Sequence, residues 1–252
     1  MPEIYEMPIT VCTHETGPDG YAGPQAVLRW MQEVAIRASA ANGFDDDFYH
    51  RTGTAWVLGG TCIDYPVPVR ARDSITVQTW IADFQRITSR RQYLFTREDD
   101  VIARGSSEWV FVSTKRRRPT RITPEMSDGF PIRPVYAPLD PDWGKDLVGD
   151  PPETGAWDAG HTVRWSDLDV YGHVNNAMYA QWFCDALYAN NTEPRMVRRL
   201  RINYAKDATF GDSVRGSIWR IDERHVGGIL RNDTTDEVLA RSVVEIGEPG
   251  SE

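Results

Sequence analysis

The sequence of 252 residues has few cysteines, no long apolar run and a deficit of basic residues. Its three cysteines are too few and too scattered for a disulfide framework or a metal site, which favours a reducing cytoplasm and no bound metal. No segment approaches the run of about 18 apolar residues that spans a membrane. Glu3 and Glu6 interrupt any signal-peptide pattern. The net charge of -9 argues against nucleic-acid binding, because neutralising phosphates needs a basic surface.

What the sequence does contain is an internal repeat. At an offset of 152 residues, Thr10, Val11, Gly20 and Trp30 fall on identical residues. Six residues between positions 63 and 83 repeat at an offset of 139, and four between positions 101 and 108 at an offset of 137. The identities keep their order and the offset changes only in connections, so we interpret the chain as two copies of one unit.

Each copy reads as a strand, a turn, a helix and a run of strands. The first copy has a strand over 5–13, a helix from 26 that ends at Asn42 and Gly43, and four or five antiparallel strands over 54–113. The second strand-rich run covers 196–246. A helix with one apolar stripe must bury it against a sheet with one apolar face, which predicts an α+β fold.

The domain boundaries follow from composition. We predict an N-terminal domain over 1–125, a proline-rich linker over 126–158, a C-terminal domain over 159–247 and a tail over 248–252. Prolines cannot donate ladder hydrogen bonds, so the linker is expected to be extended.

The most informative stretch is 161–189, where a strand leads through a polar turn into a helix. Asn175 and Asn176 are good N-cap residues, and the following apolar residues recur at three-and-four spacing. A helix N-terminus presents unpaired N–H groups and a partial positive charge, and the turn brings Asp169 and His173 to it. A carbonyl bound there would meet donors on one side and a carboxylate on the other, as acyl hydrolysis requires.

The string from Asp169 to Asn176, followed by Tyr179 and an aromatic helix, resembles the active-site turn of hotdog-fold thioesterases. The wider chain resembles the double-hotdog fatty acyl-carrier-protein (ACP) thioesterases, whose motif reads Asp-x-Asn-x-His-Val-Asn-Asn. Tyr171 stands where that family has asparagine. The resemblance implies a tandem hotdog fold, in which each half is an antiparallel sheet wrapped around a central helix.

The resemblance also implies a thioesterase that releases a free fatty acid from acyl-ACP or acyl-coenzyme A. Asp169 would be the general base or the nucleophile, and His173 would stabilise charge or move a proton. Asn175 would orient Asp169 or the water. The backbone N–H groups of Val174 and Asn176 would hold the oxyanion.

A second carboxylate is expected on the strand after the helix, where the family has a Glu-Cys pair. Asp207 would take the acidic position and Ala208 the cysteine position, so a cysteine nucleophile is missing. The first half has Gly17, Tyr21 and Gly23-Pro24 in place of the polar turn residues, which predicts a single active site in the second half. The first half would then offer an apolar groove to the acyl chain.

Other residues are expected to bind the substrate or its carrier. We expect substrate contacts from Tyr171, Tyr179, Trp30 and Met31, although Trp30 also fits a helix–sheet core. The only dense basic run is Lys115 with Arg116, Arg117 and Arg118. It fits either a solvated strand end or a docking surface for an acidic carrier protein or for the phosphates of coenzyme A.

Three functions remain open from the sequence. The first is thioester hydrolysis, the second is hydration or dehydration of an enoyl thioester on the same fold, and the third is binding of an acyl thioester without turnover. No cofactor and no membrane are expected, and the chain would act as a monomeric double hotdog or as a homodimer. An aspartate before a helix is by itself usually a cap, so Asp169 gains its catalytic interpretation only from the surrounding string.

Overall fold

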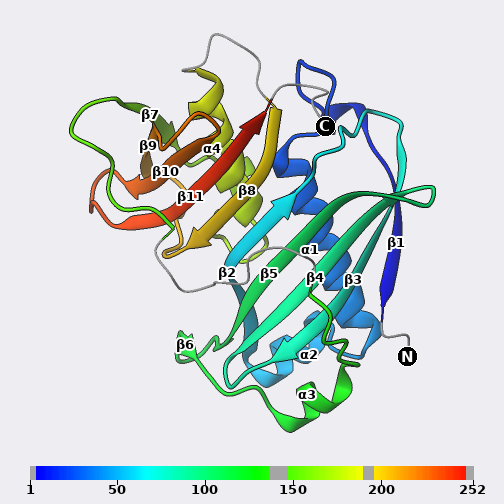
Figure 1. The fold of residues 1–252 in the computed structure, drawn as a ribbon. Helices are drawn as coiled ribbons and strands as arrows, with labels where there is room; N and C mark the ends of the chain where they lie inside the picture. Colours follow the sequence, from blue (N-terminus) through cyan, green and yellow to red (C-terminus); the bar gives the residue numbers. More distant parts are fainter. Residues whose placement is uncertain (1–3, 137–146, 190–195, 248–252) are drawn as a thin grey trace. The chain divides into compact units, whose positions relative to one another are not determined.

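The structure is a computed structural model that describes residues 4–136, 147–189 and 196–247 (Figure 1). The chain divides into two compact units, one made of Met1–Ala22 with Arg29–Trp143 and the other of Gly23–Leu28 with Gly144–Glu252. Each unit contains an antiparallel sheet and one long helix, which confirms the α+β class.

In the first unit the antiparallel strands lie in the order β1-β3-β4-β5-β2, with β6 paired to β5. The long helix α1 packs on this sheet through Met31. A Cβ atom built on Gly105 of β5 would lie 2.9 Å from Met31 Cε, so a side chain at this position would displace the end of the Met31 side chain. The elements are β1 (Tyr5–Thr10), η1 (Thr13–Glu15), α1 (Pro24–Ala41), α2 (Asp46–Thr52), β2 (Thr54–Asp64), β3 (Ser74–Phe84), β4 (Thr88–Arg97), β5 (Asp100–Ser113), β6 (Arg118–Pro119) and α3 (Pro124–Gly129).

In the second unit the antiparallel order is β8-β11-β10-β9-β7, and α4 lies against β7, β9 and β10. Phe183 of α4 sits over Gly228 of β10, where a Cβ atom would lie 2.8 Å from the ring. A strand glycine again admits the helix. The elements are β7 (Ala156–Thr162), η2 (Trp165–Asp167), α4 (Asn176–Ala189), β8 (Met196–Tyr204), β9 (Ser213–Arg220), β10 (His225–Asn232) and β11 (Val238–Gly247).

The hydrogen bonds of the two units repeat at the offsets of the sequence. The 3-10 helices η1 and η2 differ by 152 positions, and so do the left-handed Gly20 and Gly172, with φ of 82° and 78°. The repeated main-chain bonds are Val11 N to Asp73 O (2.9 Å) with Val163 N to Asp212 O (2.9 Å), and Ala22 N to Val69 O (2.8 Å) with Val174 N to Ala208 O (2.9 Å).

The element ends agree in part with the sequence expectations. Helix α1 ends at Ala41, and Gly43 follows with a φ of 88°. The sequence did not predict α2, which Asp45 caps by accepting from Phe48 N at 2.9 Å. The segment 126–158, expected to be extended, contains most of α3 and the first residues of β7. The tail 248–252 lies outside the described residues.

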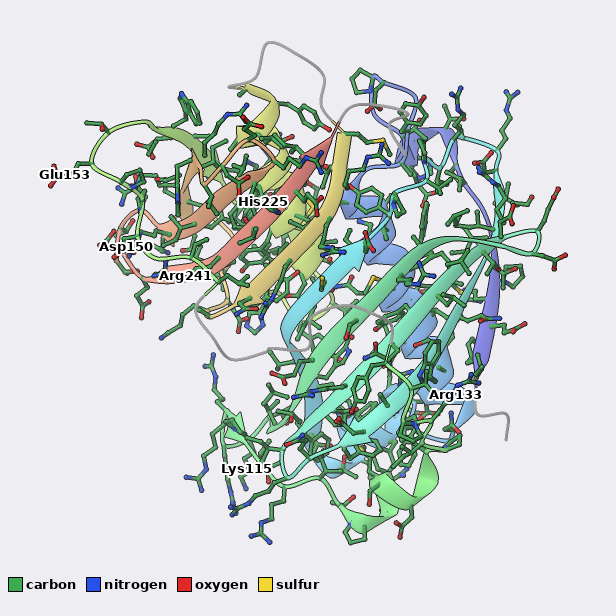
Figure 2. All side chains as sticks on the ribbon, in the orientation of Figure 1. Lys115, Arg133, Asp150, Glu153, His225 and Arg241 are labelled. Atoms are coloured by element: carbon green, nitrogen blue, oxygen red, sulfur yellow. The ribbon has the colours of Figure 1, made fainter. Side chains whose placement is uncertain are left out.

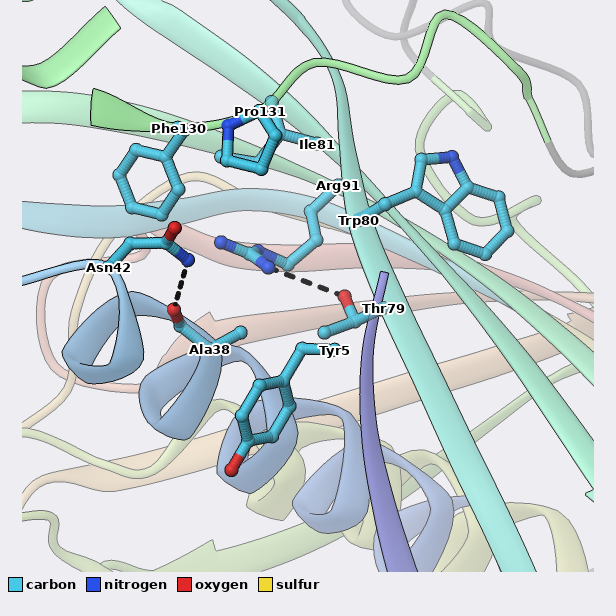
Figure 3. A pocket seen from close by; sticks show the side chains of 9 residues that line it. All are labelled: Tyr5, Ala38, Asn42, Thr79, Trp80, Ile81, Arg91, Phe130 and Pro131. Carbon is cyan, nitrogen blue, oxygen red and sulfur yellow. Dashed lines mark hydrogen bonds between the residues drawn. The ribbon is translucent and has the colours of Figure 1, made fainter. Parts of the chain in front are cut away.

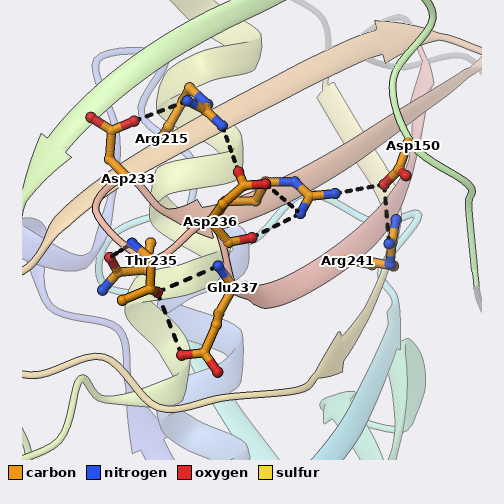
Figure 4. A network of polar contacts seen from close by, with 9 residues as sticks. Asp150, Arg215, Asp233, Thr235, Asp236, Glu237 and Arg241 are labelled. Atoms are coloured by element: carbon orange, nitrogen blue, oxygen red, sulfur yellow. Dashed lines mark hydrogen bonds and ion pairs between the residues drawn. The ribbon is translucent and has the colours of Figure 1, made fainter.

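A network of ion pairs lies over strands β9 to β11 of the second unit (Figure 4). Arg231 and Arg241 reach Asp150 at 2.7 and 3.3 Å, and Arg215 bonds Asp233 and Asp236 at 3.0 Å each. Hydrogen bonds from Arg241 lower the pKa of Asp150. These contacts fasten the segment before β7 to its own sheet.

No helix in the described ranges has the length and apolar character needed to cross a membrane.

The environments of the cysteines predict their reactivity. Cys12 is exposed, whereas Cys62 and Cys184 are 3% and 5% exposed, and burial raises the pKa of Cys184 to about 12. The thiolate is the reactive form, so a disulfide reagent at pH 8 should modify one thiol of the folded protein quickly and the other two only after denaturation. Fast modification of Cys184 in the native state, located by peptide mapping, would contradict its place in the core.

Candidate functional site

The turn before α4 is closed by the carboxylate of Asp169 as well as by its main chain. Asp169 Oδ1 accepts hydrogen bonds from Tyr171 N at 2.8 Å and His173 N at 3.3 Å, while Asp169 N donates to His173 O at 2.8 Å. Gly172 allows the left-handed bend with a φ of 78°. One carboxylate oxygen is thereby fixed, and Asp169 Oδ2 accepts no hydrogen bond from the part of the chain that is described.

The backbone donors around the helix start differ from the expectation. Val174 N donates to Ala208 O at 2.9 Å, so this N–H is occupied and the assignment of Val174 to an oxyanion hole is corrected. Asn175 N donates to Asp167 O at 2.8 Å, and Asn175 Oδ1 accepts from Ala177 N at 2.9 Å. Asn175 is therefore the N-cap of α4 and does not bond Asp169. Asn176 N–H, in the first turn, has no partner among the described residues.

The imidazole of His173 and the carboxylate of Asp207 come together as the resemblance implied. His173 Nδ1 lies 3.8 Å from Asp207 Oδ2, and the two side chains are 38% and 61% exposed. The distance is too long for a hydrogen bond, and the pair is an ion pair only when the imidazole is protonated. The sequence placed both residues at the site, and the structure adds that they are neighbours although they lie 34 positions apart.

The Tyr179 hydroxyl forms hydrogen bonds with the backbone on both sides of Asp207. The Tyr179 hydroxyl donates to Lys206 O at 3.4 Å and accepts from Ala208 N at 3.2 Å. Tyr179 is 2% exposed, and this burial raises its pKa. Tyr179 therefore lies in the core, where it positions the Asp207 segment, and not where a substrate arrives. Tyr171 is 67% exposed beside Asp169 and is accessible to a substrate.

Sequence reasoning missed a histidine–carboxylate pair beneath the turn. Asp167, 6% exposed, accepts from Arg164 N at 2.8 Å and lies 3.1 Å from His161 Nε2. The His161 ring packs on Trp182 with centroids 4.5 Å apart. Because Asp167 O also accepts from Asn175 N, this pair supports the end of the turn before α4.

The first unit's helix residues are core residues. Trp30 is 5% exposed and its indole N–H donates to Glu15 Oε1 at 2.8 Å, while Met31 is 3% exposed and packs on Gly105. In the equivalent turn Gly17 replaces Asp169, and Asp19 Oδ1 accepts from Tyr21 N at 3.0 Å. The first unit therefore forms the same main-chain turn although Gly17 has no carboxylate.

The basic run lies at the turn between β5 and β6, where Figure 2 labels Lys115. Its side chains are exposed, and none of its four cations pairs with a carboxylate of the described ranges. Neither interpretation of the run is decided by these contacts. No group of three or more histidine, cysteine, aspartate or glutamate residues in the described ranges could hold a metal ion.

Chemically, the site consists of one oriented carboxylate, one imidazole near a second carboxylate, and one open N–H at a helix N-terminus. Such a set can direct water or a carboxylate oxygen at a carbonyl and can stabilise the negative charge that develops on its oxygen.

Two family models match the chain. Residues 2–130 match the acyl-ACP thioesterase N-terminal domain, and residues 153–240 match the acyl-ACP thioesterase C-terminal domain. An acyl-ACP hydrolase of Cuphea viscosissima chloroplasts is 26% identical over 231 residues, 87% of this chain and 55% of that protein. A palmitoyl-ACP thioesterase of Cuphea hookeriana chloroplasts is 25% identical over 81% of this chain and 52% of that protein. The chain spans about half the length of these curated relatives.

Solved structures show the same fold. The 12:0-ACP thioesterase from Umbellularia californica superposes with a TM-score of 0.87 at 22% identity, covering 99% of both chains. An acyl-ACP thioesterase from Bacteroides thetaiotaomicron gives a TM-score of 0.84 at 19% identity, covering 97% of this chain and 98% of that chain. The tandem hotdog fold predicted from the sequence is confirmed.

The role given to Tyr179 can be tested by unfolding. Tyr179→Phe removes the acceptor of the buried Ala208 N–H, which should lower the free energy of unfolding by about 1–3 kcal/mol in urea denaturation. Tyr5→Phe is the control, because the Tyr5 hydroxyl makes no hydrogen bond in the described ranges and its loss should change little. If both variants have the same free energy of unfolding as the wild type, the Tyr179 hydroxyl does not stabilise the segment that carries Asp207.

Proposed function

The chain belongs to the acyl-ACP thioesterase family, and from this premise we propose that it hydrolyses acyl-ACP thioesters to a free acid and the carrier thiol. One observation carries the proposal: the turn before α4 orients Asp169 by two backbone N–H groups and sets His173 3.8 Å from Asp207. The remaining assignments below belong to the same proposal.

Asp169 has the central role. With Oδ1 held by the turn, Oδ2 has no hydrogen bond from the described residues and takes a proton from water or attacks the thioester carbonyl carbon itself. In the first case the water oxygen forms the new C–O bond, and in the second an anhydride forms and water then cleaves it. Either way the C–S bond breaks and one water is consumed for each acid and thiol released.

The oxyanion is assigned to the start of α4. Asn176 N–H is the open backbone donor there, and it lies at the positive end of the helix, where developing negative charge is stabilised. Asn175 supports this donor indirectly, since its side chain caps the helix through Ala177 N. Donors of this kind are typically worth about 10²- to 10³-fold in rate.

His173 is assigned to proton movement at the leaving sulfur, with Asp207 as the carboxylate that orients and charge-balances the imidazole. A thiolate is a good leaving group, so the demand on this proton is modest. A cysteine route is not part of the proposal, because Ala208 occupies the family's cysteine position and is 0% exposed. The Ala208 carbonyl accepts a hydrogen bond from Val174 N in the turn, and the Ala208 N–H donates to the Tyr179 hydroxyl.

The carrier and the location of the chain stay predictions. The relatives named above act on acyl-ACP, and we propose the same carrier here, docked on the basic run of Arg116, Arg117 and Arg118. A coenzyme A thioester is the other substrate that the site chemistry allows. A cytoplasmic location and a monomer or homodimer are expected from the sequence.

The base or nucleophile can be tested by Asp169→Asn, which keeps the acceptor oxygen for the turn and removes the carboxylate. We expect thiol release from acyl-ACP to fall at least about 10²-fold, with the melting temperature little changed. Asp19→Asn is the matched control, because Asp19 accepts the same kind of backbone bond in the turn of the first unit. Unchanged turnover in Asp169→Asn would exclude the proposed mechanism, and enoyl-thioester hydration without thiol release would favour the hydratase alternative.

Docking of the carrier on the basic run can be tested by Arg116→Glu with Arg117→Glu. The KM for acyl-ACP should rise several-fold at low ionic strength and its salt dependence should weaken, while kcat is retained. Arg220→Glu with Arg224→Glu changes the net charge equally at another exposed turn and should leave KM near the wild-type value. If both double variants behave alike, only net charge matters and the docking surface lies elsewhere.

A further inference from the structure

A small cavity lies inside the first unit beside Arg91, which is 7% exposed and donates from Nη1 to Thr79 Oγ1 at 3.4 Å (Figure 3). Its volume of about 20 Å³ is enough for about one water molecule and for no organic ligand. A larger partner has to be recognised elsewhere.

The most exposed apolar side chains of the described residues gather around the turn that holds Asp169. Val170, Trp165, Tyr171 and Phe210 are 94%, 78%, 67% and 63% exposed, and no other large apolar side chain in the described ranges exceeds 57%. We call these four residues the apolar patch. Proteins in solution rarely group exposed apolar side chains unless the group binds a partner.

The apolar patch lies on two neighbouring β-turns of the second unit. One turn covers residues 169–172 and the other residues 209–212, and a main-chain hydrogen bond of 3.1 Å closes each of them. His173 forms a β-bridge with the second turn, so the two turns lie side by side. The ring of Phe210 contacts the ring of Trp165, with centroids 6.3 Å apart. The patch is therefore continuous with the residues assigned to hydrolysis.

The first unit forms the same two turns without an apolar patch. Gly20 N donates to Gly17 O at 2.9 Å, and Asp73 N donates to Arg70 O at 3.1 Å, so the turn geometry does not need large apolar side chains. At the offsets of the repeat, the four patch positions are occupied there by Thr13, Pro18, Asp19 and Ala71. The patch accompanies the turn that has the carboxylate and is absent from the turn that has lost it.

We propose that the apolar patch is the surface on which the carrier protein docks while its acyl thioester is at Asp169. This inference rests on the hydrolysis of acyl-ACP proposed above. A lipid surface or a second copy of the chain on the patch would cover Asp169 and close the site to the substrate, whereas the carrier protein brings the substrate with it. Large aromatic side chains such as Trp165 supply much of the affinity of protein interfaces.

The four patch side chains carry no charge, so their contribution to binding should depend little on salt. The contact adds to the charge-based docking proposed for Arg116, Arg117 and Arg118. The different salt dependence of the two surfaces allows them to be measured separately.

The test compares dodecanoyl-ACP with dodecanoyl-pantetheine, which keeps the arm of the thioester and lacks the carrier protein. The variant Trp165→Thr with Phe210→Ala introduces the residues found at the equivalent places of the first unit. Its kcat/KM for dodecanoyl-ACP should fall at least about tenfold at low and high ionic strength alike, whereas kcat/KM for dodecanoyl-pantetheine should change less than about twofold. An equal loss with both substrates would overturn the proposal, because the side chains would then act on the arm or on the turn itself.

Trp157→Thr with Ile221→Ala is the matched control. These side chains are 38% and 50% exposed, and they lie at the ends of β7 and β9 opposite to the two turns. The control should retain kcat/KM for both substrates. A loss with dodecanoyl-ACP as large as that of the patch variant would contradict a docking surface at the patch.

Binding of the carrier is also measured without turnover, by calorimetry in the Asp169→Asn background. The Kd of dodecanoyl-ACP should rise at least about tenfold when Trp165→Thr and Phe210→Ala are added. An unchanged Kd would overturn the docking surface whatever the rate of hydrolysis. If the wild type releases no thiol from either substrate, the proposed function fails, and the calorimetric Kd still decides the role of the patch.

Val170→Ser keeps the test decisive if the double variant does not fold. Because Val170 is 94% exposed, its replacement should leave the melting temperature unchanged. The Kd of dodecanoyl-ACP should rise at least about threefold, and an unchanged value would overturn the proposal.

Two further measurements address the other occupants of the patch. The wild type and the double variant should have the same sedimentation coefficient, and neither should bind phosphatidylcholine vesicles. A dimer of the wild type that the variant loses would assign the patch to a second copy of the chain and overturn the proposal. Vesicle binding that the variant loses would assign it to a membrane, with the same consequence.

Discussion

The rest of the structure depends on main-chain hydrogen bonds that close the turn before each long helix. Val174 N bonds Ala208 O in the second unit, and Ala22 N bonds Val69 O at the equivalent place in the first. These bonds require only a backbone, so the side chains of the turn are free to differ between the units. The first unit could lose the carboxylate at the position of Asp169 without losing the turn. The two units can therefore share one turn geometry while only the second carries the carboxylate of Asp169.

A carboxylate precedes the turn in each unit, Glu15 in the first and Asp167 in the second, and the two side chains differ in length by one methylene group. In the first unit Glu15 reaches the Trp30 indole N–H at 2.8 Å. In the second unit the shorter Asp167 stands at the equivalent position, and the indole N–H of Trp182 is buried without a partner in the described ranges. His161 lies against Asp167 instead, at 3.1 Å. The second unit has exchanged a carboxylate–indole bond for a carboxylate–imidazole pair next to its functional turn.

Much of the fold could be predicted because its signals are local. The matches of the offset repeat, the apolar periodicity of α4 and the glycine after α1 lie within short windows, and the resemblance to a known family supplied the expectation of a second carboxylate at Asp207. The occupation of Val174 N–H could not be predicted, since its partner Ala208 lies on a distant segment. The backbone contacts of Tyr179 could not be predicted for the same reason: an aromatic residue on a helix has the same sequence signature whether its hydroxyl meets a ligand or a backbone group.

The pairing of His161 with Asp167 was within reach of the sequence. The carboxylates at 15 and 167 and the tryptophans at 30 and 182 repeat at the same offset, so a contact found in one unit could be sought at the equivalent place in the other. What the offset could not show is that the aspartate would fall short of the indole. That outcome depends on a length difference of about one carbon–carbon bond, which only coordinates reveal.

The interiors of the two units also differ in polarity. Among the described residues, the buried polar side chains of the first unit include Thr61, Thr79, Arg91, Gln92 and Ser107, whereas those of the second are Asp167, Ser217 and Ser242. A groove for a plain hydrocarbon chain, which the sequence suggested for the first unit, would not need a buried guanidinium. Buried polar groups cost free energy unless they are bonded, and Thr61, Thr79, Gln92 and Ser107 are each hydrogen-bonded within the first unit. The two units have therefore kept one backbone plan and placed their buried polar groups differently. In the second unit Asp167 lies in the turn before the helix and only Ser217 and Ser242 lie on strands, whereas the five residues named for the first unit all lie on strands.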